Sequence, residues 1–384
     1  MTPFAFATAT EIRFGAGVSA GAAAAAARLG RRVLVVTGAS AERAAWLFEA
    51  LEGQGLAVAA HAARGEPTVA DARAAVAVAR AHAAEVIIAV GGGAALDLGK
   101  AVAGLMGASD PMDHLEVVGR GEPLRAAPAP MIAIPTTAGT GSEVTRNAVL
   151  GAPEHGRKVS LRDQRLLPRL ALVDPELLVG LPQSVALASG LDALVQVIEP
   201  YVGRFANPLT DALCRDAIPR GLSALPRLLA GSDGAVDDAV ARADMAFTSL
   251  CGGLALTNAR LGAVHGLAGV IGGRVSAPHG ALCGRLAAPV LSLTEAALPP
   301  GHPASARFAD IRRWIAEALG GETGNAWTTL AAFADRAGLP SLSAMGVAAA
   351  DHARIAAEAL KSSSTQGAPV DPDAALLEGA LALA

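Results

Sequence analysis

The residues best suited to chemistry in this sequence are one carboxylate and two imidazoles. Asp192 lies in a stretch that reads Ser-Gly-Leu-Asp-Ala-Leu-Val-Gln, His265 follows Gly-Ala-Val, and His279 lies in Ala-Pro-His-Gly. Carboxylate oxygens and imidazole nitrogens are ligands that Zn²⁺ and Fe²⁺ take in proteins. Gln196 follows Asp192 by one helical turn, so its amide shares the helix face of the carboxylate. Whether these residues bind a metal depends on that amide, because a neutral amide oxygen is a weak ligand.

A glycine-rich segment over residues 91–100 has the composition of a phosphate-binding turn. It reads Gly-Gly-Gly-Ala-Ala-Leu-Asp-Leu-Gly-Lys and follows the β-branched run 85–90. Glycines at a strand end let the backbone approach a phosphate, and the next helix offers its first N–H groups. Asp97 and Lys100 lie three residues apart on that helix. The spacing differs from a Walker loop, so we do not expect a kinase or an ATPase.

Two other loops follow predicted strands. Residues 135–143 read Pro-Thr-Thr-Ala-Gly-Thr-Gly-Ser-Glu, and we interpret their hydroxyls and amides as the second wall of a dinucleotide cleft. The segment Gly15-Ala-Gly17 resembles a Rossmann fingerprint, but no carboxylate stands about 20 residues further on. We therefore interpret the segment Gly15–Gly17 as a plain tight turn.

The elements that must position these residues change character near residue 174. Before it, β-branched runs alternate with alanine-rich stretches of helical period, which predicts a parallel sheet that binds ligands at the carboxyl ends of its strands. After it, nearly every segment has helical period. The predicted strands are 11–14, 32–37, 85–90 and 131–135, and the predicted helices are 19–29, 40–54, 68–84, 184–202, 208–229, 235–256, 260–271 and 308–319. We predict an α/β domain over residues 1–178 and an all-helical domain over residues 179–384.

Composition limits the function further. The chain of 384 residues is 52% hydrophobic and carries a net charge of −4, so it forms a globular protein with no electrostatic footprint for nucleic acid. Its three cysteines lack CxxC spacing, which favours a reducing compartment. The N-terminus lacks a signal peptide, and no uninterrupted apolar run has the length of a membrane span. We expect a cytoplasmic protein without a membrane partner.

Together these segments resemble the iron-containing (group III) alcohol dehydrogenase family. The hydroxyl-rich loop 135–143 carries most of the resemblance, and Asp174-Pro-Glu, residues 206–211 and Pro278-His-Gly add to it. The resemblance runs over nearly the whole chain. It implies a dehydroquinate synthase-like fold, with a dinucleotide-binding domain followed by a helical metal and substrate domain.

The resemblance also implies roles for residues of the first domain. The cofactor is NAD or NADP, and its expected contacts are Gly38, Ser40, Gly92, Gly93, Asp97, Thr136, Thr137, Thr140, Lys158 and Leu178. Members that prefer NAD often carry Asp where this chain has Gly38. Removing that carboxylate removes its repulsion of a 2′-phosphate, and Ser40 with Arg43 could hold one. We therefore favour NADP(H), or use of both cofactors.

In the second domain the resemblance implies that His265 and His279 are catalytic and that Asp192, Gln196, His265 and His279 bind the metal. Gln196 stands where the family has a third histidine, and Gly269 replaces a further histidine near the nicotinamide. Three outcomes follow. Three ligands can hold a catalytic zinc, Gln196 can orient a bound water, or the site is metal-free and a histidine acts directly on the carbonyl. We favour a metal, with Zn²⁺ more tolerant of three ligands than Fe²⁺.

The expected reaction is hydride transfer between a nicotinamide and the carbonyl carbon of a small aldehyde or ketone, with a metal polarising the carbonyl. Arg260, Arg274 and Ser276 could bind a carboxylate, so an oxo acid is a second expected substrate. The closest alternative is a metal-independent reductase similar to maleylacetate reductase. A lyase of the dehydroquinate synthase type and a catalytically inactive cofactor-binding protein are further alternatives. The resemblance implies a homodimer.

Overall fold

The protein consists of two compact units in a computed structural model that describes residues 3–108, 110–231 and 238–384. One unit contains residues 8–137 and 141–179. The other contains the N-terminal residues up to Ala7, together with Ala138–Thr140 and Gly180–Ala384. We call the first the α/β unit and the second the helical unit. The domain boundary between residues 178 and 179 stays a prediction.

A parallel sheet forms the centre of the α/β unit, in the strand order β1-β8-β5-β4-β2-β3. The parallel arrangement predicted from the βα alternation is confirmed by the register of every neighbouring pair. The central strands are continuous apolar runs because both of their faces are covered. The strand bounds are β1 Ile12–Phe14, β2 Arg32–Thr37, β3 Ala57–Ala62, β4 Val86–Gly91, β5 Met131–Pro135 and β8 Leu170–Val173.

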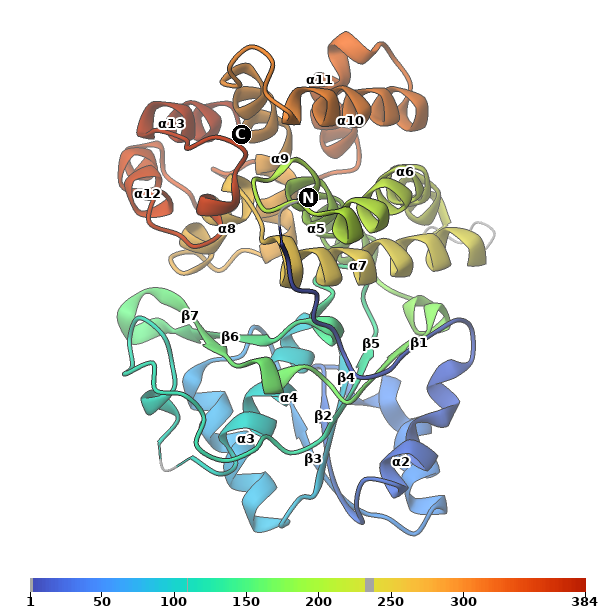
Figure 1. Cartoon of the computed structure of the whole chain (residues 1–384). Coiled ribbons are helices and arrows are strands. Elements are labelled where there is room, and N and C mark those ends of the chain that lie inside the picture. The colour runs from blue at the N-terminus through green and yellow to red at the C-terminus, as the bar shows by residue number, and fades with distance from the viewer. Residues whose placement is uncertain (1–2, 109, 232–237) are drawn as a thin grey trace. The chain divides into compact units, whose positions relative to one another are not determined.

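Helices cover both faces of this sheet (Figure 1). Leu34 and Val36 of β2 pack in one apolar cluster with α3 and α4, whereas Val33 and Val35 pack in another with α1 and α2. This alternation follows from the period of two along a strand, which sends successive side chains to opposite faces. The helices are α1 Ala22–Ala27, α2 Ala45–Gly53, α3 Val69–Ala81 and α4 Gly93–Leu105.

An antiparallel hairpin completes the α/β unit. Strands β6 (Asn147–Ala152) and β7 (Arg157–Arg162) pair along their whole length, and Gly156 turns the chain between them with φ of 58°. Only glycine adopts this left-handed conformation without strain. The hairpin was not predicted from the sequence.

The helical unit is built around α5 (Gln183–Val202), which packs against α6, α7, α9 and α10. This helix is long and apolar enough to cross a membrane, yet 89% of its most apolar window is buried inside the protein, as in a core helix. The predicted helix at 235–256 is observed as α7, and its predicted first residues lie outside the described part of the chain. The remaining bounds are α6 Pro208–Gly231, α7 Ala239–Ala259, α8 Ala263–Gly272, α9 His279–Ala296, α10 Ala304–Leu319, α11 Ala326–Arg336, α12 His352–Ala359 and α13 Ala374–Leu383.

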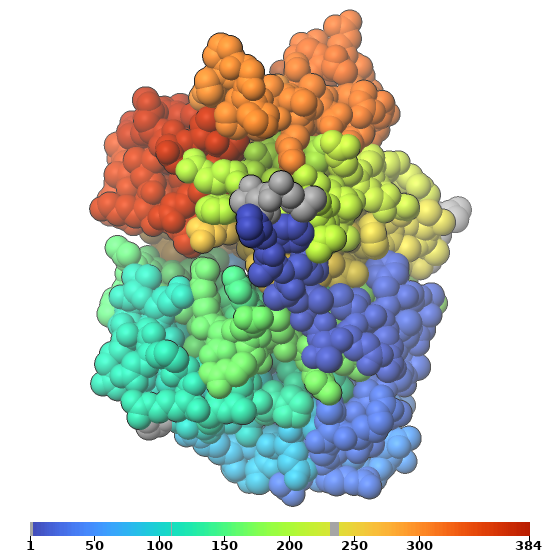
Figure 2. Space-filling view, viewed as in Figure 1, coloured from blue at the N-terminus to red at the C-terminus, as the bar shows by residue number. Residues whose placement is uncertain are grey.

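The N-terminal residues 3–7 belong to the helical unit rather than to the unit that follows them in sequence. The backbone N–H of Ala7 donates to the Asn258 side chain at 2.6 Å, and the Asn258 amide donates to the Ala7 carbonyl at 2.9 Å. Figure 2 shows the start of the chain, in dark blue, at the surface. The last helices, α10 to α13, appear there in orange and red.

Candidate metal centre and nucleotide-binding turns

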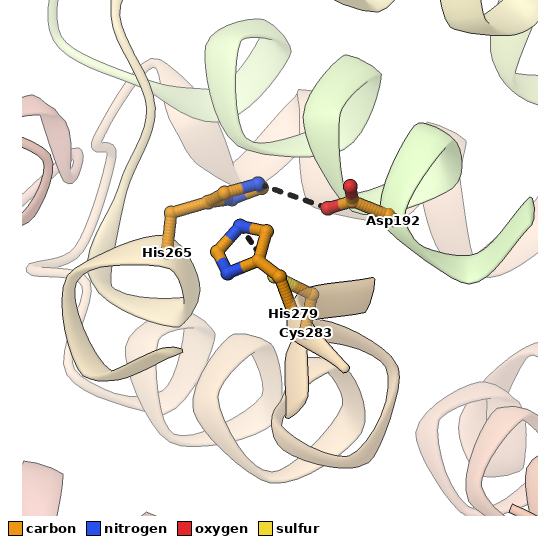
Figure 3. A group of neighbouring side chains, drawn as sticks. All are labelled: Asp192, His265, His279 and Cys283. Carbon is orange, nitrogen blue, oxygen red and sulfur yellow. Dashed lines mark hydrogen bonds and ion pairs between the residues drawn. The ribbon is translucent and has the colours of Figure 1, made fainter. Parts of the chain in front are cut away.

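Four side chains with metal-ligand atoms meet inside the helical unit. One ligand atom from each of Asp192, His265, His279 and Cys283 lies within 4.8 Å of all the others (Figure 3). Asp192 comes from α5, His265 from α8, and His279 and Cys283 from the first two turns of α9. The structure therefore brings together Asp192, His265 and His279, which were predicted to bind a metal, and adds a thiol.

The contact between α9 and α5 sets the distance from Asp192 to His279 and Cys283. A Cβ on Gly280 would overlap the carbonyl oxygen of Ala188 on α5. A Cβ on Gly284 would lie 2.6 Å from a methyl carbon of Leu191. Larger residues at these two glycines would push the helices apart. The close approach of the two backbones therefore brings the ligands on α5 and α9 near one another.

His265 is oriented by a carboxylate behind it. Its Nδ1 donates to Glu199 Oε2 at 2.7 Å, and the backbone N–H of Val264 donates to Glu199 Oε1 at 2.7 Å. A carboxylate only accepts, so Nδ1 carries a proton, and in the neutral ring Nε2 presents its lone pair to the cluster. Gly262 permits this approach, because a Cβ there would lie 2.6 Å from Glu199 Oε1.

This role of Glu199 was not predicted from the sequence. Glu199 lies two helical turns after Asp192, so the two carboxylates share one face of α5. That spacing was visible. The sequence did not predict the bend of 99° between α7 and α8, which brings His265 onto that face.

The cluster is electrostatically incomplete without a cation. Asp192 Oδ1 and His265 Nε2 lie 3.3 Å apart, and both atoms are buried without a hydrogen-bond partner among the described residues. Burial alone would lower the pKa of His265, but Cys283, Asp192 and Glu199 outweigh it and raise that pKa well above its usual value. Burial opposes ionisation of Asp192, yet His265 and His279 hold its pKa below the usual value. These residues fit a divalent cation, which would satisfy both orphaned atoms at once.

Cys283 is the member of the cluster that the sequence analysis missed. Its sulfur lies 3.6 Å from His279 Nε2, one helical turn away on α9. Burial raises the pKa of this thiol to about 12, partly offset by His265. The spacing of four residues from His279 was the signal available in the sequence, because it places the thiol on the same helix face as the imidazole.

Gln196 has a different partner. Its amide nitrogen donates to the backbone carbonyl of Thr140 at 2.7 Å, which ties α5 to residues 138–140 of the same unit. The amide also packs tightly against α7, since a Cβ on Gly252 would lie 3.1 Å from its nitrogen. Gly139 is equally confined, with Ser189 Cβ 2.9 Å from where its own Cβ would lie.

In the α/β unit the predicted phosphate turns meet at the carboxyl ends of neighbouring strands. The N–H of Thr136 donates to the Gly91 carbonyl at 2.9 Å, and the N–H of Gly38 donates to Val90 at 3.2 Å. A Cβ on Gly92 would lie 3.2 Å from the Thr137 hydroxyl. The first N–H groups of a helix have no intrahelical partner, and the N-cap residue Gly92 has no side chain that could accept from those of α4. Such a helix start suits a phosphate.

Asp97 and Lys100 form a buried polar cluster on α4. Asp97 Oδ1 accepts from the Ser142 hydroxyl at 2.5 Å, and its Oδ2 accepts from the Val149 N–H at 3.0 Å. Lys100 Nζ lies 3.0 Å from Asp97 Oδ1 and donates to the Thr145 hydroxyl at 2.7 Å. Both oxygens of Asp97 therefore bind the protein itself, and its predicted contact with a cofactor stays a prediction.

Three other predicted cofactor contacts, Ser40, Lys158 and Leu178, lie in the α/β unit. Lys158 on β7 forms an ion pair of 2.5 Å with Glu66, and Leu178 is buried at 5% exposure. Ser40 is exposed and precedes a short 3-10 helix without capping it. Arg43, expected to help hold a 2′-phosphate, donates to the carbonyls of residues 177 and 179 at 2.9 Å.

Two of the three residues expected to bind a substrate carboxylate have partners within the protein. The guanidinium of Arg274 pairs with Glu358, and that of Arg260 lies 4.3 Å from the ring centroid of Phe205. Arg274 Nη1 is nevertheless buried without a hydrogen-bond partner among the described residues, so the predicted contact of Arg274 with a substrate carboxylate stays a prediction. In the α/β unit, the Gly15–Gly17 turn follows β1 and Asp174 follows the neighbouring strand β8. The Asp174 carboxylate accepts from the N–H groups of residues 17 and 19 at 3.1 Å and so holds the turn in place.

Family models for both halves of the chain match it. Residues 9–175 match "Iron-containing alcohol dehydrogenase" and residues 186–379 match "Fe-containing alcohol dehydrogenase family, C-terminal". A 4-hydroxybutyrate dehydrogenase from Cupriavidus necator is 35% identical over 74% of this chain and 74% of its own. A 1,3-propanediol dehydrogenase from Klebsiella pneumoniae is 36% identical over 64% of this chain and 60% of its own.

Solved structures agree with the fold over the full length. A 1,3-propanediol oxidoreductase superposes with a TM-score of 0.88 at 28% identity and covers 99% of both chains. An alcohol dehydrogenase from Oenococcus oeni gives a TM-score of 0.87 at 28% identity, again over 99% of both chains. Among curated relatives, the matched segment spans only 59% of the length of Alcohol dehydrogenase 4 from Saccharomyces cerevisiae, at 36% identity.

Proposed function

The chain belongs to the iron-containing alcohol dehydrogenase family, and from this premise we propose that it is an NAD(P)-dependent oxidoreductase that interconverts a small alcohol and its aldehyde or ketone. In the oxidative direction the alcohol carbon loses a hydride to NAD(P)⁺ and its hydroxyl loses a proton. The products are the carbonyl compound, NAD(P)H and H⁺. The observation that carries the proposal is the buried cluster of Asp192, His265 and His279, with Glu199 behind it.

The residues of this cluster would hold a divalent zinc or iron ion. A metal bound there supplies Lewis acidity that polarises a carbonyl oxygen. Asp192 provides the negative charge, and the two imidazoles provide neutral nitrogen ligands. Glu199 keeps the His265 ring in the orientation and tautomer that a ligand needs. His265 and His279 are catalytic in this proposal because they hold the ion rather than because they transfer a proton.

The nucleotide half of the proposal rests on the turns of the α/β unit. Gly92 and Gly93 at the start of α4 suit the pyrophosphate, and Thr136 and Thr137 provide hydroxyls at the neighbouring strand end. Thr140, Lys158 and Leu178 are further proposed contacts by family resemblance. Gly38 at the end of β2 carries no charge that would repel a 2′-phosphate, so we favour NADP(H).

The substrate is proposed only as a class. The relatives named above act, by their names, on 1,3-propanediol and 4-hydroxybutyrate, and another is named choline dehydrogenase. All three names denote small hydroxyl compounds, which supports a small alcohol or its carbonyl partner. We further propose a homodimer and a cytoplasmic location, the latter supported by three buried cysteines that form no disulfide.

The test uses the full chain purified without chelator, assayed for NADH and NADPH oxidation with a panel of aldehydes, ketones and oxo acids. We expect activity that a chelator removes and that Zn²⁺ or Fe²⁺ restores. Asp192→Asn should lower kcat/KM on the order of 100-fold or more. The exposed carboxylate of Asp216 provides the matched control, Asp216→Asn, which should keep full activity.

Two results would count against this function. If no carbonyl compound in the panel supports NAD(P)H oxidation, the oxidoreductase proposal is overturned. If activity persists in the presence of chelator and in Asp192→Asn, the metal is wrong and a metal-independent oxo-acid reductase is the better description. The cofactor preference is tested by Gly38→Asp, which should shift preference from NADPH to NADH. Gly53→Asp is its control, because neither glycine has an atom within 4 Å of an added Cβ.

A further inference from the structure

We propose that Cys283 is the fourth protein ligand of the metal and that Gln196 lies outside its coordination sphere. This inference rests on the metal in the proposed function and specifies its ligands. The donor set becomes one carboxylate oxygen, two imidazole nitrogens and one thiolate sulfur, and the carbonyl oxygen of the proposed function would approach as a fifth ligand. The ligand that the family draws from the position of Gln196 is replaced from the opposite helix, by a residue of α9 instead of α5.

The separations between ligand atoms match a common tetrahedral ion. Bonds of about 2.1 Å to nitrogen or oxygen and about 2.3 Å to sulfur place tetrahedral neighbours about 3.4 Å apart, or about 3.6 Å when one of them is sulfur. Asp192 Oδ1 and His265 Nε2 are 3.3 Å apart. Cys283 Sγ and His279 Nε2 are 3.6 Å apart. Each pair thus has the spacing of two ligands on one ion.

The surroundings of the sulfur support its inclusion. Cys283 has an exposed fraction of 0% and faces both His265 and Asp192, which are buried at 6% and 2% exposure. The Asp192 and His265 atoms that face the cluster lack hydrogen-bond partners among the described residues. Figure 3 shows Cys283 beside His279, on the same helix. A thiol placed at random in an apolar core would not sit among three other ligand atoms.

Gln196 is better explained as a positioning residue. Its nitrogen donates to the Thr140 carbonyl, which determines the orientation of the amide and ties residues 138–140 to α5. Gly252 makes room for the amide in this position, since a Cβ there would lie 3.1 Å from its nitrogen. A neutral amide oxygen also competes poorly for a divalent ion against a thiolate.

The donor set favours Zn²⁺ over Fe²⁺. Thiolate is a soft ligand that zinc accepts readily, and zinc has no preference from its d electrons against a tetrahedral site. When the ion binds, the sulfur–metal bond forms as the thiol proton leaves to solvent, so charge and atoms balance. The protein purified without chelator should therefore contain zinc in preference to iron when both are supplied.

The decisive experiment replaces the metal with Co²⁺ and records the absorption spectrum of the full chain. A cobalt–thiolate bond gives a charge-transfer band in the near ultraviolet, which oxygen and nitrogen ligands do not give. We expect this band in the wild type at one cobalt per chain. Cys283→Ser should lose the band and weaken metal binding by more than about 100-fold, beyond the usual effect of losing an outer partner of a ligand.

The chain offers two matched controls, because Cys214 and Cys251 are also buried free thiols of the helical unit. Cys214→Ser and Cys251→Ser should keep the band. Gln196→Met, similar in size and without a donor, should keep the band and bind metal within about threefold of the wild type if the amide is not a ligand. Metal competition with a chromophoric chelator measures each affinity without any assay of activity.

The outcomes separate this proposal from the proposed function. Cobalt bound without the band in the wild type overturns the role of Cys283 and leaves the oxidoreductase proposal standing. A band that survives in Cys283→Ser also overturns it. A large loss of affinity in Gln196→Met overturns the role given to Gln196. The wild-type spectrum alone tests whether a thiolate binds the metal, so the test does not depend on whether Cys283→Ser folds.

Discussion

At the scale of single residues, the site depends most on side chains that would never touch a substrate. Glu199 accepts one hydrogen bond from His265 and one from the backbone N–H of Val264. Two N–H donors therefore share one carboxylate, and each oxygen serves one of them. The orientation of the His265 ring follows from this pair of contacts.

We predict that Glu199→Gln lowers metal affinity by about 10- to 100-fold. An amide offers only one acceptor oxygen, so one of the two N–H donors loses its partner and meets an NH₂ group instead. Competition with a chromophoric chelator measures the change. Glu317→Gln is the control, because Glu317 is an exposed carboxylate on α10 in the same unit. Equal affinities of Glu199→Gln and the wild type would show that the contact does not orient a ligand.

Glu143 is the residue whose ionisation should be visible in stability. Burial raises the pKa of its carboxyl from 4.5 to about 7, against the opposing effects of its own backbone hydrogen bond and of Lys100. Because the folded pKa exceeds the unfolded one, the folded state binds the proton more tightly between these two values. The contribution of Glu143 is therefore most favourable below about pH 4.5 and is lost as the pH rises through about 7.

From this shift we predict a loss of unfolding free energy on the order of 3 kcal/mol between pH 5 and pH 8 in the wild type that is absent in Glu143→Gln. Urea unfolding of both proteins at the two pH values measures the difference. Subtracting the variant from the wild type removes the contributions of other groups. A difference that does not change with pH would contradict the assignment of this shift to Glu143.

At the scale of elements, the cluster around Lys100 joins α4 to the segment that follows the hydroxyl-rich loop. Asp97 reaches Ser142 and the first strand of the hairpin at Val149, while Lys100 reaches Thr145. These contacts place the start of α4 and residues 142–149 as one piece. We infer that this cluster keeps the glycine turn and the hydroxyl-rich loop in their relative positions.

Lys100→Met should therefore destabilise the protein by about 3 kcal/mol, because it leaves Asp97 without its buried counter-charge. Lys361→Met is the control, since Lys361 is exposed and its removal should cost less than about 0.5 kcal/mol. Chemical denaturation of both variants gives the two free energies. Equal stabilities would mean that Lys100 is only packed in the core and not paired there.

The elements also show what the sequence could predict. Strands β2, β4 and β5 were predicted within a residue of their bounds, because each is a β-branched run covered on both faces. Strand β3 was missed because it reads Ala-Val-Ala-Ala-His-Ala and alanine has little preference for strands. It forms at the edge of the sheet through its pairing with β2 alone. That pairing is a tertiary contact, which the local sequence pattern does not specify.

The site divides in the same way. Asp192, His265 and His279 could be predicted from their motifs, whereas Cys283 and Glu199 could not be placed without the packing of α5, α8 and α9. Their roles depend on glycines at positions 262, 280 and 284, which let the helices and their connections approach closely. Sequence spacing indicates which residues share a helix face, but not which helix that face meets.

At the scale of the whole molecule, every residue of the metal cluster comes from the helical unit. An ion that binds the folded unit and not the unfolded chain stabilises it by about 4 kcal/mol at a thousandfold excess over Kd. Its removal should loosen that unit selectively. The proposed nucleotide-binding turns at Gly38, Gly92 and Thr136 belong to the α/β unit, whereas Thr140 belongs to the helical unit, and none of these residues is a ligand in the cluster.

We therefore predict that chelation accelerates amide hydrogen exchange in α5 and α9 and leaves β2 and β4 unchanged. Mass spectrometry of peptides from the four elements resolves the two units within one sample. Adding NADP⁺ instead should protect peptides from the start of α4. Uniform acceleration across all four elements after chelation would contradict a stabilising effect confined to the helical unit.

The close packing of α9 on α5 at Gly280 and Gly284 affects how fast a bound ion would exchange rather than how tightly it would bind at equilibrium. Asp192 lies on α5, and His279 and Cys283 lie on α9, so an ion bound to all three loses its ligands from both helices together only when those helices separate locally. Such opening is a partial unfolding event, with the steep dependence on temperature that unfolding has. The residence time of the ion would then be set by the rate at which the helix pair opens, and a protein with modest equilibrium affinity would still exchange its metal slowly.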